Sequence, residues 1–406
     1  MQSICSMKGE CKIYKLGDVC DVINGLWTGK KGPFINICVI RNTNFTKDCK
    51  LNLDDVAYID AEVKQFSTRK LQVGDIIVEK SGGSDKQPVG RVVLFDVGEG
   101  DYSFSNFTSA LRVKGDIDPK YLHKCLLAHY RRGETEKLQS KTTGIRNLDM
   151  KGYLRLPIPI RPLPEQERIV AELDCLSDII EKQKQQLKEL DSLAQSIFYT
   201  TFGDPISNNF GWKNRRLGEI VNSNMIGLTR SGSEQDASYE YLYFKMNNIG
   251  NEGGVDWSKT TRVNACAQEV EKYTLKEGDF LFNTRNSFEL VGKTCVYPHI
   301  DGEVCLFNNN VMRIDFKKEI NVTYMAYLFQ DKYIKNQLDR IKKGTTSVWA
   351  IYYKDLEKID ILVPDIVRQE EFASKVAAIE KQKEIIKQSI AETETLFNSR
   401  MDYYFN

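Results

Sequence analysis

PEQERIVAEL (residues 164–173) and VRQEEFASKV (residues 367–376) are two versions of one stretch, and they stand 203 positions apart. Each version opens a long run in which polar and apolar residues alternate. Pro162 or Pro164 begins the first run and Pro364 precedes the second, at positions where a missing backbone N–H costs a helix nothing. Both runs therefore predict a long helix.

Apolar residues recur along both runs at spacings that alternate between four and three, which is the pattern of a heptad seam. The predicted seam is Ile169, Leu173, Leu176, Ile180, Gln183, Leu187, Leu190, Ala194 and Ile197 in the first helix, and Phe372, Val376, Ile379, Lys383, Ile386, Ile390, Thr393 and Phe397 in the second. Such a seam would also suit an amphipathic helix on the core of its own domain. However, each row runs for about 30 residues, or roughly 45 Å, and polar residues interrupt both. We therefore expect the two helices to pair with each other, antiparallel, and Gly203 to end the first.

The helical stretch is one end of a longer duplication. Matching blocks recur in the same order at offsets of 201 to 204 residues. They are residues 16–19 with 217–220, 41–45 with 245–249, 73–78 with 277–282, 88–91 with 290–293, and 147–160 with 350–363. An order and an offset kept this closely indicate an internal repeat.

Each repeat starts with short alternating apolar runs between Gly, Asn and Asp turns, which is typical of strands in a mixed α/β globule. Helical stretches near residues 118–137 and 321–340 close the two globules. The predicted fold class is α+β: two similar mixed α/β globular domains separated by two long antiparallel coiled-coil helices, in a pseudo-twofold internal repeat. The predicted boundaries are residues 1–160 for the first domain, 161–203 for the central helix, 204–362 for the second domain and 363–406 for the C-terminal helix.

Composition sets broad limits on the function. Hydrophobic residues make up 41% of the chain, which suffices for packed cores, and no apolar run approaches the ~20 residues of a membrane span. The N-terminus lacks the order of a secretion signal, and ten cysteines without a CxxC pair are expected to be reduced thiols in a cytoplasmic protein. The net charge is +1, although residues 1–163 hold 26 Lys and Arg against 19 Asp and Glu. A nucleic-acid partner would have to meet local positive charge, or charge that another subunit supplies.

No catalytic constellation stands out. The stretch 290–294 resembles the last part of a phosphate-binding P-loop, but Ser287 stands where that motif requires its first glycine. Asp75 and Glu79 faintly resemble a nuclease carboxylate cluster, and Asn283 replaces the glutamate in the second repeat. Neither the Asn-Pro-Pro-aromatic nor the Asp-Pro-Pro-Tyr motif of adenine methyltransferases is present. We expect no metal, no cofactor and no catalysis in this chain, which favours a binding role.

Polar and basic loop residues recur at matching points of the two repeats and suit contacts with DNA. Arg and Lys can bond guanine edges, Asn can pair with adenine, and hydroxyls can hold phosphates. Any one of them is more often solvated surface, but their recurrence favours each cluster as a set. The candidates are Lys30, Lys31, Arg41, Asn42, Asn44, Lys80, Ser81, Lys86, Arg91, Lys141, Thr142, Thr143 and Arg146 in the first repeat, and Arg230, Lys245, Asn247, Asn248, Arg285, Asn286, Lys293, Lys342, Lys343, Thr345, Thr346 and Trp349 in the second.

Three pairs of motifs carry a resemblance to a known family. They are Gly-Asp at 74–75 and 278–279, Lys-Thr-Thr-Gly at 141–144 with Lys-Gly-Thr-Thr at 343–346, and PLPEQERIV at 162–170 with VRQEEF at 367–372. In this order, twice over and each time before a long helix, they resemble the DNA-specificity subunit of Type I restriction–modification systems over nearly the whole chain. The second copy departs from the proline-rich pattern of the first, since only Pro364 remains.

The resemblance implies a division of labour. Each globule would be a target-recognition domain that reads one half of a bipartite double-stranded DNA site. The helices would set the gap and dock two adenine methyltransferase subunits, which use S-adenosylmethionine, and two restriction–translocase subunits would complete the restriction complex. This chain would be a non-catalytic subunit that binds no cofactor and no membrane.

Other classes of protein remain open from the sequence. One is a specificity subunit of a related multi-subunit methyltransferase system. Another is a stand-alone nuclease or methyltransferase with degenerate motifs, which would cut or methylate DNA alone. A third is a coiled-coil scaffold joining two protein-binding domains, which would show no salt-dependent affinity for duplex DNA.

Overall fold

The computed structural model of the chain describes residues 11–27, 31–84, 87–142, 145–251, 253–298, 300–344 and 347–406. Contacts divide the chain into two units. Unit 1 comprises residues 1–184 and 388–406, and unit 2 comprises residues 185–387. Each unit therefore contains one globule and a part of both long helices.

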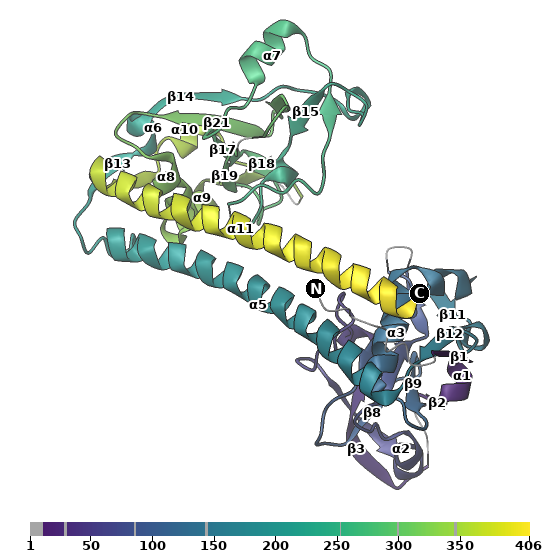
Figure 1. The fold of residues 1–406 in the computed structure, drawn as a ribbon. Coiled ribbons are helices and arrows are strands. Elements are labelled where there is room, and N and C mark those ends of the chain that lie inside the picture. The colour runs from purple at the N-terminus through teal and green to yellow at the C-terminus, as the bar shows by residue number, and fades with distance from the viewer. Residues whose placement is uncertain are drawn as a thin grey trace, which may run out of the picture. The chain divides into compact units, whose positions relative to one another are not determined.

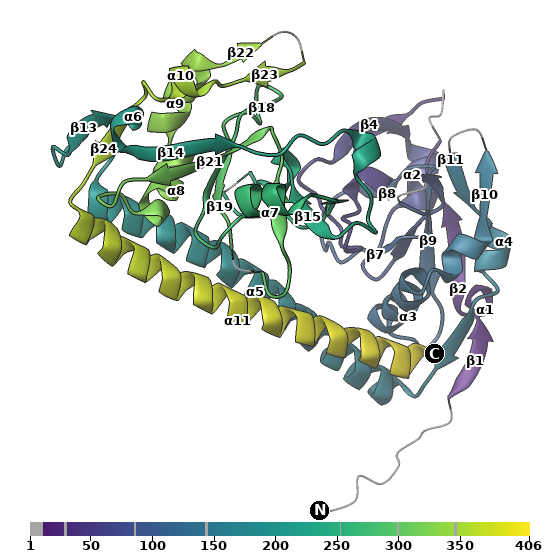
Figure 2. The same ribbon diagram turned by 90° about the horizontal axis from the view of Figure 1, so that it is seen from above.

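The two long helices are α5 (Leu163–Phe202) and α11 (Ile366–Phe405), each of 40 residues. Figures 1 and 2 show them side by side. In unit 1 the first part of α5 meets the last turns of α11, where Tyr404 Oη donates to Glu172 at 2.6 Å. In unit 2 the end of α5 meets the start of α11, where the rings of Phe202 and Phe372 lie 5.3 Å apart. The expected antiparallel pairing is confirmed.

The end of α5 follows from its sequence. Gly203 has a φ of +77°, and its N–H donates to Tyr199 O at 2.9 Å. A left-handed residue directly after the last helical one caps the open carbonyls, and glycine takes this conformation without strain. The predicted end of the helix is confirmed.

The structure buries or half-buries every predicted seam position. Ile169 and Leu173 belong to the core of unit 1, and Phe372 and Val376 to that of unit 2. Gln183 and Lys383, which interrupt the seam, have polar partners: Gln183 Nε2 donates to Ser389 Oγ at 2.7 Å, and Lys383 pairs with Asp191 at 2.7 Å. The heptad periodicity thus predicts the inward-facing positions of the polar residues as well as those of the apolar ones.

The described residues of unit 1 form four small sheets in its globule. A four-stranded antiparallel sheet has the order β2-β9-β5-β7, and a mixed sheet has the order β4-β3-β8 with β3 and β8 parallel. The other two are the pair β1-β12 and the sheet β10-β11-β6. The strands are β1 (Lys12–Lys15), β2 (Cys20–Asn24), β3 (Phe34–Ile40), β4 (Ala57–Glu62), β5 (Ile76–Glu79), β6 (Ser81–Gly83), β7 (Val92–Leu94), β8 (Tyr102–Phe104), β9 (Thr108–Val113), β10 (Gln139–Thr142), β11 (Ile145–Leu148) and β12 (Pro157–Ile160); the helices are α1 (Leu16–Val19), η1 (Asn42–Asn44), α2 (Val63–Arg69), α3 (Pro119–Arg131), η2 (Glu134–Leu138) and α4 (Met150–Tyr153).

Unit 2 repeats this topology sheet for sheet. Its sheets are β14-β21-β17-β19, β16-β15-β20 with β15 and β20 parallel, β13-β24 and β18-β23-β22. The strands are β13 (Lys213–Arg216), β14 (Val221–Ile226), β15 (Tyr241–Phe244), β16 (Arg262–Val263), β17 (Phe280–Asn283), β18 (Arg285–Asn286), β19 (Thr294–Val296), β20 (Cys305–Phe307), β21 (Val311–Phe316), β22 (Lys343–Gly344), β23 (Trp349–Ala350) and β24 (Asp360–Val363); the helices are α6 (Leu217–Ile220), η3 (Gly232–Glu234), η4 (Met246–Asn248), α7 (Ala267–Tyr273), α8 (Val322–Gln330), α9 (Lys332–Ile341) and α10 (Tyr353–Leu356). The expected fold of two similar α/β globules and two long helices is confirmed.

The predicted closing helices differ from the structure in detail. The stretch 118–137 is α3 followed by the 3₁₀ turn η2, because Gly133 between them has a φ of +71°. The stretch 321–340 is two helices, because Asp331 has an extended backbone and its carboxylate accepts from Tyr333 N at 2.7 Å as the N-cap of α9. Capping side chains of this kind start a new helix where the hydrophobic periodicity alone predicts a continuous one.

A buried glutamine accounts for the repeated stretch at the start of each long helix. Gln166 and Gln369 are both fully buried. The side chain of Gln166 accepts from Asp118 N at 2.9 Å, and that of Gln369 accepts from Asn321 N at 2.8 Å. Each amide also donates at 2.7 Å to a carbonyl five residues earlier. The glutamine therefore ties the start of the long helix to the N-cap of the closing helix in the same unit.

The repeated Gly-Asp motif has a structural role. Asp75 accepts from Gln72 N at 2.8 Å and from Arg112 Nη2 at 2.7 Å. Asp279 likewise accepts from Lys276 N at 2.8 Å and from Arg313 Nη1 at 3.3 Å. The carboxylate thus closes a tight turn and pairs with an arginine of the neighbouring strand. These contacts occupy the acid that faintly resembles part of a nuclease cluster.

Candidate nucleic-acid interface

The small three-stranded sheet of each unit gathers candidate segments that lie far apart in the sequence. In unit 1, the pairing of β11 with β6 places the strand pair β10-β11 beside Ser81. In unit 2, β18, β23 and β22 place Asn286 opposite Trp349 and Lys343 opposite Ala350. Figure 2 shows these three strands close together. The same kind of surface is therefore built from matching segments in both units.

A short turn, η1, adjoins this sheet in unit 1. The amide Nδ2 of Asn42 lies 3.3 Å from Glu79 Oε1. Ser81 Oγ donates to Asn147 Oδ1 at 2.6 Å, and Lys80 Nζ donates to Asn24 Oδ1 at 3.0 Å. Partial burial lowers the pKa of Lys80. The turn lies next to β6, since a Cβ on Gly82 would be 2.7 Å from Asn42 Nδ2.

Three predicted contact residues are buried in the structure. Arg91 lies beneath η1, and its guanidinium pairs with Glu79 at 2.8 Å. The amide of Asn44 donates to two backbone carbonyls of the following loop at 3.1 and 2.9 Å, and that of Asn248 does the same at 2.8 and 3.0 Å. These three side chains hold turns together, and their polar atoms are engaged within the globules.

Several of the basic candidates are engaged within unit 2. Arg230 pairs with Glu269 at 2.6 Å and Lys343 with Asp355 at 2.6 Å. Lys342 donates to Phe288 O at 2.6 Å, and Lys245 to Gln235 Oε1 at 2.9 Å. Lys293 donates to Ile249 O, and burial lowers its pKa. Because these basic side chains are engaged within the unit, fewer of them are available to contact DNA than their number in the sequence predicts.

Other candidates lie open on the surface. The side chains of Lys31, Arg41, Asn247 and Arg285 are exposed, and within the described ranges no ion pair engages them. Besides the half-buried candidates described above, three more are half-buried. They are Asn286, Arg146, which donates to Gln139 Oε1 at 3.3 Å, and Trp349, whose ring lies 5.0 Å from that of Phe288. Lys30, Lys86, Thr143, Thr345 and Thr346 lie outside the described residues, as do the side chains of Lys141 and Thr142.

A repeated Gly-Leu pair was missed by the sequence analysis. A Cβ on Gly25 would lie 1.9 Å from Ser105 O, and a Cβ on Gly227 would lie 2.2 Å from Phe307 O. Only glycine allows the chain to pass this close to the facing backbone. Trp27, two residues after Gly25, is 67% exposed. The pair recurs at an offset of 202 residues, so the duplication itself would have revealed it.

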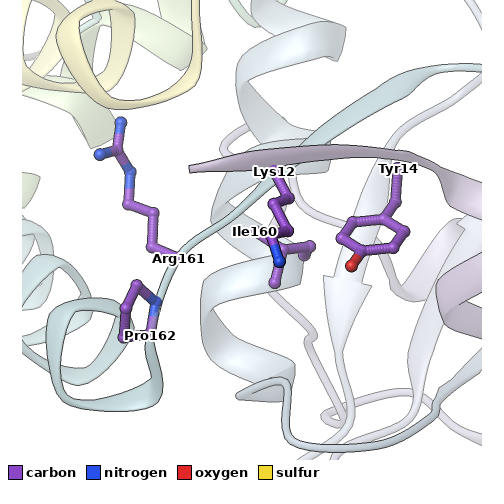
Figure 3. A pocket seen from close by; sticks show the side chains of 5 residues that line it. All are labelled: Lys12, Tyr14, Ile160, Arg161 and Pro162. Atoms are coloured by element: carbon purple, nitrogen blue, oxygen red, sulfur yellow. The ribbon is translucent and has the colours of Figure 1, made fainter. Parts of the chain in front are cut away.

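One shallow pocket lies elsewhere in unit 1. It has a volume of about 320 Å³ and is lined by Lys12, Tyr14, Ile160, Arg161 and Pro162 (Figure 3). The Arg161 side chain points away from Lys12 and Tyr14, and its Nη2 donates to Tyr404 O at 3.3 Å. None of the candidate DNA contacts lines this pocket.

Two searches of the described residues bear on other classes of site. In the parts of the chain that the structure describes, no group of three His, Cys, Asp or Glu side chains could hold a metal ion. Across the same ranges, the helices include none whose length and apolar character would let it span a bilayer.

Comparison with known proteins identifies the class of this duplicated architecture. The family described as Type I restriction modification DNA specificity domain matches residues 8–191 and again residues 209–395. The Type I restriction enzyme EcoKI specificity subunit of Escherichia coli (strain K12) is 23% identical over 387 residues, which cover 90% of this chain and 81% of that protein.

Solved structures share the fold. The Type I restriction–modification S subunit from M. genitalium covers 98% of this chain and 97% of its own, with a TM-score of 0.53 and 15% identity. A chain from a study of complex assembly and conformational transition of the type I R-M system covers 98% of both chains, with a TM-score of 0.58 and 18% identity.

The chain therefore belongs to the Type I restriction–modification DNA specificity family, of which it carries two domains. It is the DNA specificity subunit of such a system, and this subunit is non-catalytic within the complex. The two globules are accordingly target-recognition domains, and they and the two long helices are parts of a DNA specificity subunit.

Proposed function

We propose that each globule reads one half of a bipartite double-stranded DNA site, through its small three-stranded sheet and the turns beside it. One observation carries the proposal: matching segments build the same candidate surface twice, once in each unit. The side chains on the two surfaces differ, as with Asn42 in the first and Met246 at the matching position in the second. Two different recognition surfaces on one chain recognise an asymmetric DNA target.

The helices α5 and α11 supply the spacer in this proposal. Each is continuous over 40 residues, which corresponds to about 60 Å at 1.5 Å per residue. Half-sites on one face of B-DNA are separated by about a helical turn, or ~34 Å. A pair of continuous helices can fix such a separation, whereas a flexible linker would leave it variable.

The proposed partners follow from the same assignment. Two adenine methyltransferase subunits dock on the helical spacer and bring S-adenosylmethionine and the catalytic site, and two restriction–translocase subunits complete the restriction complex. Apolar residues on α5 and α11 that are exposed in the described part of the chain support such docking. They include Ile179, Leu193, Ile385 and Leu396.

A heptad insertion tests the spacer. Seven residues are added to both helices, after Lys184 and after Lys387, so that the seam stays in phase. The helices then lengthen by about 10.5 Å, which corresponds to about three base pairs at 3.4 Å each. Methylation mapping with the assembled complex should show a longer gap and unchanged half-sites.

Two controls accompany the insertion. The heptad placed in α5 alone mismatches the seam and should weaken folding without giving a defined new gap. Exchange of residues 1–160 for another recognition domain should change one half-site only. Altered half-site bases with an unchanged gap in the double insertion would show that the helices do not set the spacing.

A further inference from the structure

A buried ion pair lies directly beneath the η1 turn of unit 1. Arg91 Nε donates to Glu79 Oε2 at 2.8 Å, and Arg91 Nη2 donates to Glu79 Oε1 at 3.0 Å. The two side chains are 6% and 1% exposed. Burial lowers the pKa of Arg91, but the hydrogen bonds to Glu79 and its charge outweigh this effect, so the pKa is raised overall and the guanidinium stays charged. Moving two charges out of water is costly, and a buried ion pair is therefore weak evidence for a gain in stability. The groups that the pair holds in place are a better guide to its role.

The pair holds both ends of the turn and one of its side chains. Arg91 Nη2 donates to Asn42 O at 3.2 Å, and Nη1 donates to Phe45 O at 2.8 Å. Its guanidinium also lies over the Phe45 ring, 5.6 Å from the centroid. Glu79 Oε1 in turn accepts from Asn42 Nδ2. The backbone and the amide of Asn42 are therefore fixed by the same two residues.

The amide of Asn42 keeps hydrogen-bonding capacity to spare. Glu79 uses one N–H, and in the described part of the chain no other hydrogen bond engages the amide. Gly82 on β6 lies beside it: a Cβ there would be 2.7 Å from Asn42 Nδ2, and the residue has a φ of +100° that favours glycine. The ring of Phe107, which is 43% exposed, lies next to the same glycine. The amide thus borders the exposed Gly82, which has no side chain to cover it.

We propose that Asn42 is a base-reading residue of the first domain, and that Glu79 and Arg91 are the positioning pair that sets its amide. The remaining N–H and Oδ1 of Asn42 match the N7 acceptor and the N6 amino group of adenine. Side chains whose orientation is locked by buried partners discriminate better than freely rotating ones. This inference rests on the proposed function of the domain.

The second domain supports the role of the cation by a variation on the same arrangement. Lys293 takes the place of Arg91 and donates to Ile249 O, the counterpart of Phe45 O. Asn283 takes the place of Glu79, is fully buried, and accepts from Arg285 N at 3.2 Å. Met246 stands where the first domain has Asn42. Here Asn283 holds the backbone of the exposed Arg285, whose guanidinium suits guanine, so the two domains differ in what they present.

The test compares three variants of the full chain in complex with its methyltransferase subunits. Asn42→Ala should lower discrimination about tenfold at one position of the first half-site. Arg91→Lys keeps the charge but cannot form all four bonds of the guanidinium, so it should relax the same position to a smaller extent. The matched control is Arg112→Lys, which weakens the Arg112–Asp75 pair elsewhere in the same globule and should leave base preference unchanged.

Base preference is measured by methylation mapping and by competition among a library of bipartite sites, and folding by thermal unfolding. If Arg91→Lys fails to fold, Asn42→Ala decides alone, because Asn42 is half-exposed and its loss leaves the ion pair intact. The inference is overturned if folded Asn42→Ala keeps the wild-type preference throughout the first half-site. A wild-type complex without any bipartite preference would instead overturn the proposed function.

Discussion

Phe372 offers a direct measure of how much the second long helix contributes to unit 2. The side chain is fully buried in the first turns of α11. Its ring lies 5.7 Å from that of Phe198, 5.3 Å from that of Phe202 and 5.1 Å from that of Tyr327, in edge-on arrangements. Phe→Ala in a core costs about 3–5 kcal/mol, so we expect Phe372→Ala to destabilise unit 2 by about 4 kcal/mol.

Thermal unfolding followed by calorimetry measures this loss. For a domain of 150–250 residues, each kcal/mol lowers Tm by about 2–4 °C, so the midpoint should fall by about 8–16 °C. The matched control is Ile385→Ala on the same helix, where a 60% exposed side chain makes the expected change less than about 0.5 kcal/mol. If Phe372→Ala unfolds within about 2 °C of the wild type, the packing of α11 does not stabilise unit 2 as argued.

Three further changes probe other features. Gly25→Ala should destabilise unit 1 by about 3 kcal/mol in a denaturant titration, because its Cβ would meet Ser105 O at 1.9 Å; wild-type stability would contradict the close approach. The hydrogen bond from Arg400 lowers the pKa of Glu172, so its stabilisation is present above the unfolded value near 4.5 and is lost as pH falls through the folded pKa. The wild type should therefore be more stable than Glu172→Gln at neutral pH, and this difference in the free energy of unfolding should shrink as the pH falls below 4.5. A difference that stays constant with pH would rule this out. Gln183→Leu should raise stability by about 1 kcal/mol, because the buried Oε1 of Gln183 has no hydrogen-bond partner among the described atoms; a loss of stability would mean that the amide is needed.

Much of the architecture could be predicted because the sequence contains an internal repeat. The offset between the copies separates structural positions from accidental ones, as it does for Gly74-Asp75 and Gly278-Asp279. The long helices were predictable because a heptad seam of this length exceeds what one globule can cover. The break between α8 and α9 was not, since it depends on the single cap at Asp331 within an apolar stretch.

The candidate site was less predictable than the fold. Composition cannot tell a basic residue that faces solvent from one that serves a turn, so Arg91 and Arg41 look alike in the sequence. The two arginines differ in burial. The burial of Arg91 depends on the strand that brings Glu79 against it, and the sequence does not show that pairing. The amides of Asn44 and Asn248 suit pairing with adenine, but in the structure they donate to backbone carbonyls of their own loops.

Each globule is fastened where its chain enters and leaves. β1 pairs with β12 in unit 1, and β13 pairs with β24 in unit 2, each over four residues. A gene segment exchanged with a relative would carry a complete recognition module only if its crossover points fell outside these strand pairs. Joints inside the long helices leave both strands of a pair on the same segment, so recombination there should yield folded chimaeras with new combinations of half-sites.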